Sequence, residues 1–298
     1  MTLLLALTAC EKQSSRIILE SGNAVYYWRT DLRLDSAERD FLAQYHINKV
    51  YCRYFDVVMN DAGEPKPNAT ISFSDTLPDS IEIIPTVYIT EDCMHEKHEG
   101  LAERIVKRIR QMNETNDVKN VSEIQIDCDY TSKSRKRYYA FLEEVRRLWS
   151  ASIPSQSSQS SESRSASEAR LSTTIRLHQL AMEAPPVDYG ALMIYNTGDP
   201  RKWEERNPIL DFRDVEPYLR RLDGYPLPLA AAYPVFQWTY TIQGVRVDRT
   251  VEAEVILQVK KAMESERADL SNLIITYHLD KDNIERYKPE TYEEIYHH

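Results

Sequence analysis

Eight short runs rich in apolar and β-branched residues recur along the sequence, and they alternate with segments of helical periodicity. Strands that alternate with helices pair in parallel, because each connection carries the chain back to the starting edge of the sheet. Eight such units in a chain of 298 residues predict a single-domain α/β protein, a (β/α)8 TIM-like barrel. The predicted strands cover residues 24–28, 49–58, 81–89, 123–130, 172–180, 190–196, 228–238 and 273–279.

The segments between the strands carry apolar residues at the spacing of one helix face. In residues 99–113, for example, Leu101, Ile105 and Ile109 share a face, and Asp35 is placed to cap the first helix. A doubly wound open sheet is the alternative fold. That fold normally carries a glycine-rich phosphate loop, and neither GxGxxG nor GxxxxGK[ST] occurs here. The predicted helices cover residues 36–45, 99–113, 132–149, 211–222 and 249–267.

Charge and cysteine content exclude several classes of function. The net charge is -10, whereas neutralising phosphates needs an excess of lysine and arginine, so we predict no nucleic-acid partner. The cysteine spacing matches no zinc pattern, and the segment CMHEKHE is not the HExxH motif, so a solvated helix start explains it better than a metal. We therefore predict no metal and no cofactor. Cys52 and Cys128 lie in strand runs and are expected to be buried.

The reactive residues of a barrel lie at the carboxyl ends of its strands. At the predicted strand ends, carboxylates and aromatic side chains predominate, and this combination suits a sugar, because aromatic faces stack on the rings while polar groups bind the hydroxyls. His178 is either a base or a core histidine. The substrate-binding candidates are Trp28, Arg53, Asp56, Tyr130, His178, Asn196, Trp238 and Tyr277.

The run IQIDCDY contains the strongest candidate site. Period-two alternation places Gln125, Asp127 and Asp129 on one strand face and the apolar residues between them on the other, so both aspartates should face the barrel interior. Buried carboxylates are costly unless they are paired or functional. The alternative is a hydrogen-bonded structural cluster with Arg53 or Tyr195.

The first ten residues, MTLLLALTAC, resemble the end of a bacterial lipoprotein signal peptide. Leu7 to Cys10 has the form of a lipobox, so the resemblance implies that residues 1–9 are removed and that Cys10 carries the lipid. Residues 10–22 would be a tether and residues 23–298 the barrel. The implied location is the bacterial cell envelope, periplasmic or surface-exposed, with the membrane as a partner through the lipid anchor.

The strand-four Asp-x-Asp and the run LMIYN resemble glycoside hydrolase family 18, the chitinase-like barrels. That family carries Asp-x-x-Asp-x-Asp-x-Glu on strand four and Met-x-Tyr-Asp on strand six. Asp127 and Asp129 match its last two aspartates, and Met193 and Tyr195 match its methionine and tyrosine. The family's glutamate, which is the general acid, falls on Thr131. The family's first strand-four aspartate falls on Ile124 and its strand-six aspartate on Asn196.

Longer stretches, including TIRLHQL and PPVDYGALMIYN, resemble a group of bacterial lipoproteins that have no established activity. Together the resemblances imply a carbohydrate ligand and two alternative functions. In a glycosidase-like enzyme, Asp129 would be the acid or stabiliser, Asp127 would tune the pKa of Asp129, Tyr195 would bond the sugar, and Glu91 would be a substitute proton donor. In a binding or scaffold protein, the general acid would be lost, as Thr131 indicates.

One segment has no periodicity. Residues 152–167 are mostly serine and cannot bury apolar area, so we expect a disordered loop there. The loop follows the fourth helix and precedes the fifth strand, which places it at the barrel end opposite the candidate site.

Overall fold

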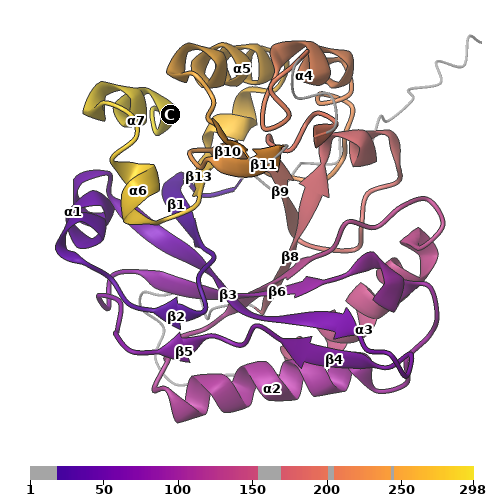
Figure 1. Ribbon diagram of the computed structural model, residues 1–298. Coiled ribbons are helices and arrows are strands. Elements are labelled where there is room, and N and C mark those ends of the chain that lie inside the picture. The colour runs from indigo at the N-terminus through magenta and orange to yellow at the C-terminus, as the bar shows by residue number, and fades with distance from the viewer. Residues whose placement is uncertain (1–18, 154–168, 201–204, 243–244) are drawn as a thin grey trace, which may run out of the picture.

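Eight parallel strands close into a barrel, as the sequence predicts (Figure 1). The computed structural model describes residues 19–153, 169–200, 205–242 and 245–298. The barrel strands are β1 (Gly22–Tyr27), β3 (Ile47–Met59), β6 (Glu82–Ile89), β7 (Glu123–Asp127), β8 (Arg170–Arg176), β9 (Tyr189–Met193), β10 (Leu229–Pro234) and β13 (Leu273–Tyr277). Their order around the ring is β1, β13, β10, β9, β8, β7, β6 and β3, and β3 pairs with β1 to close it.

Five further strands lie outside this ring. The strand β4 (Pro65–Asn68) is antiparallel to β3, and β2 (Asp31–Leu32) pairs with β5 (Ser72–Phe73). A hairpin of β11 (Trp238–Ile242) and β12 (Val245–Arg249) follows β10. The predicted seventh strand, 228–238, is therefore too long: it ends at Pro234, and Trp238 opens the hairpin.

Helices cover the outside of the barrel, with α4 and α5 on one side and α2 on the opposite side (Figure 1). Asp35 caps the first helix as predicted: its side chain accepts a hydrogen bond from Glu38, and the Glu38 side chain accepts one from the Asp35 backbone. The helices are α1 (Ser36–Gln44), α2 (Leu101–Thr115), α3 (Arg135–Ser152), α4 (Phe212–Leu219), α5 (Ala253–Glu266), α6 (Lys281–Ile284) and α7 (Pro289–Ile295), with 3-10 turns η1 (Glu91–Met94), η2 (Leu177–Ala181) and η4 (Ala268–Ser271).

The connection after β8 departs from the predicted pattern. The strand ends at Arg176 rather than near Leu180, and the turn η2 replaces an α-helix. Pro185 and Pro186 lie in this short connection, and proline supplies no backbone N–H for a helix. His178 consequently sits in a turn and not on a strand.

The C-terminal helix α7 completes the outer layer. Phe41 of α1 lies 5.0 Å, between ring centroids, from Tyr292 of α7, and Tyr45 lies 5.8 Å from Tyr296. The Tyr296 hydroxyl also bonds Thr276 of β13 at 2.6 Å. These aromatic contacts cover β1 and β13, so α7 lies over the barrel surface.

The barrel interior is polar along β7. Tyr26 of β1 donates a hydrogen bond to Gln125 at 2.8 Å, although β1 and β7 are not neighbours in the ring, so the bond crosses the interior. The predicted inward face of β7 is thereby confirmed for Gln125, and alternation places Asp127 on the same face. Cys52 and Cys128 are buried, as expected.

Several predictions fall on residues that the structure does not describe. Cys10, the signal segment 1–9 and most of the tether 10–22 lie outside the described residues, as does nearly all of the serine-rich segment 152–167. Gly22, assigned to the tether, already belongs to β1. Within the described residues, no helix has the length and apolar character needed to cross a membrane.

Candidate functional site

Asp127, Asp129 and Arg176 form an ion-pair cluster at the carboxyl ends of β7 and β8. The Arg176 Nε donates to Asp129 Oδ1, and Arg176 Nη2 lies 3.6 Å from Asp127 Oδ1. Thr174 donates a hydrogen bond to the same Asp127 oxygen at 2.6 Å. The two carboxylates differ in exposure: the Asp127 side chain is 3% exposed and that of Asp129 48%. Asp127 is therefore the buried carboxylate of the cluster, and Asp129 is the one that faces solvent.

Burial raises the pKa of Asp127 to about 6, because the charged carboxylate loses its hydration. Arg176 opposes the rise, while the nearby charges of Asp129 and Asp56 add to it. Burial alone would lower the pKa of the Arg176 guanidinium, but Asp127 and Asp129 raise it above its usual value. The cluster thus holds one permanent cation beside one carboxyl that titrates near neutral pH.

Neither Arg53 nor Tyr195, the two candidate partners, hydrogen-bonds Asp127 or Asp129 in the described part of the chain. Arg53 donates from Nε to Asp56 Oδ1 at 2.7 Å, and its guanidinium lies 5.5 Å from the ring centroid of Trp28. Arg53 and Asp56 are three apart, so regular alternation would place them on opposite faces. A β-bulge between Arg53 and Phe55 adds one residue and turns both charged side chains inward.

A cavity of about 240 Å³ lies beside the cluster. Tyr195 is 3% exposed, its ring packs 4.9 Å from that of Tyr277, and its hydroxyl has no hydrogen-bond partner among the described residues. Burial lowers the pKa of His178, which keeps its imidazole neutral near pH 7. The cavity is lined by Asp129, Arg176, Leu177, His178, Met193, Tyr195, Asn196, Thr197 and Tyr218.

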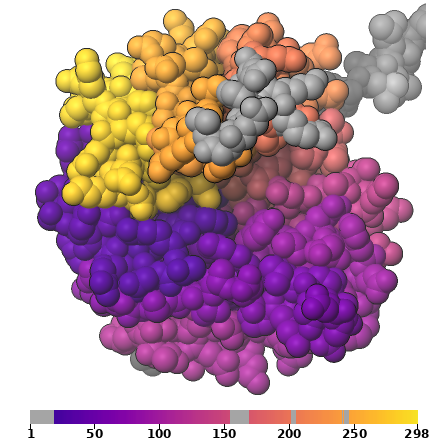
Figure 2. All heavy atoms as spheres, viewed as in Figure 1, coloured from indigo at the N-terminus to yellow at the C-terminus, as the bar shows by residue number. Residues whose placement is uncertain are grey.

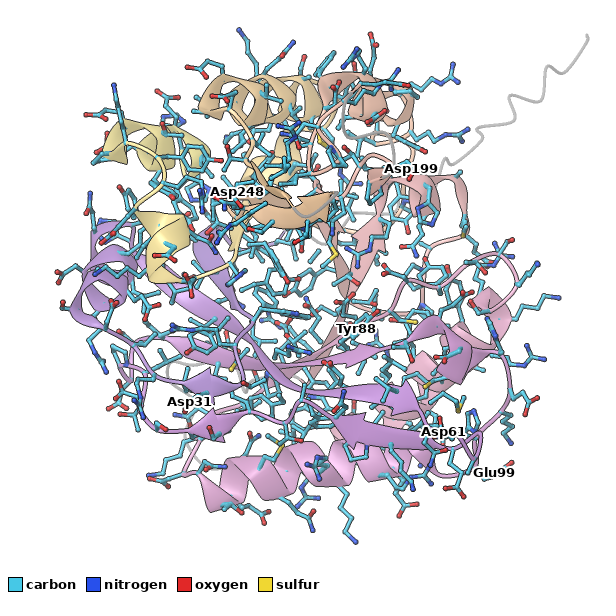
Figure 3. The ribbon with its side chains drawn as sticks, viewed as in Figure 1. Asp31, Asp61, Tyr88, Glu99, Asp199 and Asp248 are labelled. Atoms are coloured by element: carbon cyan, nitrogen blue, oxygen red, sulfur yellow. The ribbon has the colours of Figure 1, made fainter. Side chains whose placement is uncertain are left out.

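Aromatic side chains surround the mouth of the barrel. Tyr277 lies 5.6 Å from Trp28 and 5.4 Å from Phe236, between ring centroids, and Trp238 lies 6.3 Å from Phe236. Tyr88 of β6 pairs in register with Asp127 and lies near the centre of the ring of strands in Figure 3. Burial, and then Asp129 and Asp127, raise the pKa of Tyr88 to about 12, so it is a neutral phenol.

Asp129, His178, Tyr195 and Asn196 are the sequence candidates that line this cavity, whereas Tyr130 and Glu91 are engaged elsewhere. Tyr130 is fully buried and its ring stacks 4.9 Å from that of Tyr138 on α3, so a ligand at the mouth cannot reach it. The strand predicted over residues 123–130 ends at Asp127, and the chain beyond it carries Tyr130 against α3. Glu91 accepts hydrogen bonds from Thr131 at 2.6 Å and Ser134 at 2.8 Å.

These bonds decide the protonation state of Glu91. Burial acts to raise its pKa, but the hydroxyls of Thr131 and Ser134 and the adjacent His95 lower it below its usual value. A carboxylate stabilised in the ionised form is a poor proton donor, so the geometry disfavours Glu91 as a substitute general acid. Instead, the hydrogen bonds that Glu91 accepts from Thr131 and Ser134 connect the end of β6 to the start of α3.

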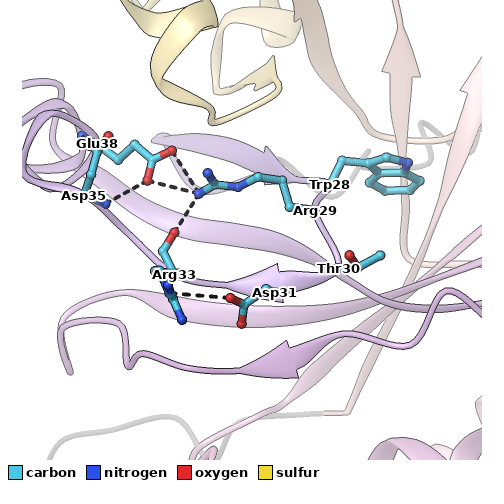
Figure 4. A pocket seen from close by; sticks show the side chains of 7 residues that line it. All are labelled: Trp28, Arg29, Thr30, Asp31, Arg33, Asp35 and Glu38. Atoms are coloured by element: carbon cyan, nitrogen blue, oxygen red, sulfur yellow. Dashed lines mark hydrogen bonds and ion pairs between the residues drawn. The ribbon is translucent and has the colours of Figure 1, made fainter.

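A second hollow, of about 560 Å³, extends from Trp28 to the start of α1 (Figure 4). Arg29 crosses it and pairs with the buried Glu38 at 2.9 Å and with Asp280 at 3.7 Å. The remaining lining residues are Thr30, Asp31, Arg33 and Asp35.

Sequence reasoning missed Arg176 and Tyr88. The signal for Arg176 was present, because period-two alternation of Ser172, Thr174 and Arg176 puts all three on one face of β8. Tyr88 is placed by its register against Asp127, which the sequence does not display. Within the described residues, no group of three or more histidines, cysteines, aspartates and glutamates is arranged to hold a metal ion.

Three solved structures share this fold. The spore cortex-lytic enzyme SleL of Bacillus cereus matches 93% of this chain and 74% of its own, with a TM-score of 0.55 and 12% identity. A chitinase from Bacteroides thetaiotaomicron matches 94% of this chain and 99% of its own, with a TM-score of 0.56 and 9% identity. The chitinase-like agglutinin RobpsCRA of Robinia pseudoacacia matches 92% and 99%, with a TM-score of 0.57 and 10% identity. The sequence matches no protein-family model and no curated protein.

These likenesses establish the class of fold, a TIM-like barrel of the kind found in chitinases. In Figure 2 the N-terminal part of the chain, indigo to magenta, forms the lower half of the face and the C-terminal part, orange and yellow, the upper half. The cavity draws on both parts, since Asp129 precedes α3 and Tyr218 belongs to α4.

Proposed function

We propose that this protein binds a carbohydrate in the cavity at the mouth of its barrel. The cavity combines a carboxylate, a guanidinium, an imidazole and an amide with the rings of Tyr195 and Tyr218. Polar groups of this kind bind sugar hydroxyls, and aromatic faces stack on sugar rings. Two proteins of the same fold are a chitinase and a chitinase-like agglutinin, which supports a carbohydrate ligand without naming it.

The ion-pair cluster is the observation that favours binding over hydrolysis. A general acid must carry a proton and reach the leaving-group oxygen. Asp127 has the raised pKa but is buried, while the exposed Asp129 is paired with Arg176. The position two residues beyond Asp129 is Thr131, which donates its hydroxyl hydrogen to Glu91. The exposed carboxyl that lines the cavity, Asp129, is therefore held by a guanidinium in the described part of the chain.

A glycan array probed with the full-length protein tests the binding proposal. We expect a subset of glycans to bind, and we expect Asp129→Asn and Tyr195→Phe to weaken that binding roughly 10-fold or more, because each change removes a polar partner in the cavity. Asp61→Asn is the matched control, because Asp61 is an exposed aspartate at the edge of the barrel (Figure 3). Failure of the whole array would refute the proposal.

Hydrolysis is a second candidate, favoured by the pKa of about 6 of Asp127, which is in the range that suits a proton donor near neutral pH. An enzyme of this kind would release reducing sugar ends from the glycans that bind. Asp127→Asn would then abolish release while binding persists. If the wild-type protein releases no reducing ends from any bound glycan, the protein acts by binding alone.

We also propose that Cys10 carries a lipid that anchors the barrel to the bacterial cell envelope, either periplasmic or surface-exposed. The support is the lipobox form of Leu7 to Cys10. The full-length protein is expected to partition into detergent, and Cys10→Ser is expected to remain in the aqueous phase. Equal partitioning of the two proteins would remove this proposal.

A further inference from the structure

The charges at the barrel mouth do not balance. Two guanidinium groups, Arg53 and Arg176, face three carboxyl groups, Asp56, Asp127 and Asp129. Arg53 is committed to Asp56, which leaves Arg176 shared between Asp127 and Asp129. His178 is neutral because burial lowers its pKa, so it adds no positive charge near pH 7. With all three carboxyls ionised, these described residues carry one negative charge more than the two guanidinium groups neutralise.

This surplus lies where water cannot screen it well. Asp127 is almost wholly buried, and Arg176 is 17% exposed. The free protein avoids the surplus in part by retaining a proton on Asp127, as its raised pKa shows. A bound cation would neutralise the same charge without that proton.

Unused acceptors line the adjoining cavity. Asp129 Oδ1 is occupied by Arg176, whereas Asp129 Oδ2 accepts no hydrogen bond from the described residues and its side chain is 48% exposed. The buried Tyr195 hydroxyl is also without a partner in the described part of the chain. A ligand with a hydrogen-bonding group can satisfy this hydroxyl. Both groups can accept hydrogen bonds, which is what an ammonium group requires.

We propose that the cavity takes a sugar unit bearing a protonated amino group, as in a de-N-acetylated hexosamine, with its ammonium against Asp129 and Tyr195. This inference rests on the proposed carbohydrate-binding function and names the ligand class for the same cavity. A sugar acid would bring a fourth negative charge to the mouth and is disfavoured. An N-acetylated sugar carries no charge and leaves the surplus in place.

The test compares oligomers of glucosamine and of N-acetylglucosamine, matched in length, by isothermal titration calorimetry with the full-length protein near pH 6.5. We expect the glucosamine oligomer to bind roughly 10-fold tighter or more. Asp129→Asn keeps the shape and removes the charge, so it should abolish the preference, while Asp61→Asn should retain it. Tyr195→Phe removes only the unpartnered hydroxyl and should weaken binding of the glucosamine oligomer several-fold.

The outcomes separate the two proposals. Equal or tighter binding of the N-acetylated oligomer by the wild-type protein overturns the inference and leaves carbohydrate binding standing. An array on which every bound glycan is neutral or anionic also overturns the inference and leaves carbohydrate binding standing. A preference that survives in Asp129→Asn, with its thermal unfolding unchanged, also overturns the inference. Absence of any bound glycan overturns the proposed function itself.

Discussion

Glu123 and Asp127 are both buried on the same face of β7, but they differ in their hydrogen-bond and ion-pair partners. Glu123, at the start of the strand, accepts hydrogen bonds from Tyr189 and from Ser172, the latter at 2.7 Å, and lies 3.8 Å from the Lys49 ammonium. Asp127, at the end of the strand, has one hydroxyl partner and shares its guanidinium with Asp129. Both have raised pKa values, chiefly through burial.

The difference lies in what surrounds each carboxylate. Glu123 is part of a network that reaches across the barrel, since Tyr189 of β9 also bonds Tyr51 of β3. Asp127 shares Arg176 with Asp129, and both Arg176 and Asp129 line an open cavity. A buried carboxylate is therefore not in itself a sign of function. The open cavity beside Asp127 distinguishes the two ends of the strand.

The largest effect is expected for Glu123→Ala. The change leaves the hydroxyls of Ser172 and Tyr189 without their shared acceptor inside the barrel, while Lys49 keeps Glu82 at 3.1 Å. Leaving two buried donors unpaired, at about 1–3 kcal/mol each, costs about 4 kcal/mol of unfolding free energy, which denaturant unfolding would measure. Glu123→Gln keeps an acceptor and the shape, and should cost less. A loss below about 1 kcal/mol would contradict a structural role.

The second-largest loss of unfolding free energy is expected for Arg176→Met. The change removes the cation that Asp127 and Asp129 share and leaves a buried carboxylate without compensation. We expect a loss of about 3 kcal/mol near pH 7, measured by denaturant unfolding. The loss should shrink near pH 5, because Asp127 then holds its proton and no longer needs the cation. An equal loss at both pH values would mean that packing rather than charge explains the effect.

The raised pKa of Asp127 predicts how the stability of the protein changes with pH. Its pKa is about 6 in the folded protein and about 3.9 in an unfolded chain. Between these values the folded state binds the extra proton, so the stability contributed by this group is full below about pH 4 and falls as pH rises to about 6.

Asp127→Asn cannot titrate, so its unfolding free energy should rise relative to the wild type across that window. The relative gain is at most about 3 kcal/mol, the linkage energy of the raised pKa. Thermal or denaturant unfolding of both proteins at several pH values measures it. A constant difference between them would show that Asp127 does not titrate in this range.

The smallest stability effect is expected for Asp129→Asn. Its ion pair with Arg176 is half exposed, and exposed pairs contribute about 1 kcal/mol or less. The melting temperature should therefore stay close to that of Asp61→Asn, even though ligand binding weakens. A large drop in melting temperature would place Asp129 with Glu123 as a structural residue.

The sequence predicted the barrel and most of its elements because the patterns involved are local. The apolar runs and helix faces located all eight barrel strands, and Asp35 located the start of α1. The errors occur at strand ends. Residues 177–180 and 235–238 continue the apolar pattern but form a turn and the approach to a hairpin. Strand ends depend on which partner continues the ladder, and periodicity carries no information about partners.

For the candidate site, the sequence by itself determined the face of each residue on β7. Gln125 and Asp127 point inward because the side chains of a strand alternate, whatever surrounds it, whereas Asp129 and Tyr130 lie beyond the end of β7 at Asp127. Only the tertiary structure decided which group pairs with Asp127 and Asp129. Arg53 and Tyr195 were the candidate partners, but the Tyr195 hydroxyl has no partner among the described residues, and a bulge in β3 turns Asp56 inward beside Arg53, which leaves the aspartates to Arg176. Ion pairing depends on distances between strands brought together by closure of the ring, and no local pattern specifies those distances.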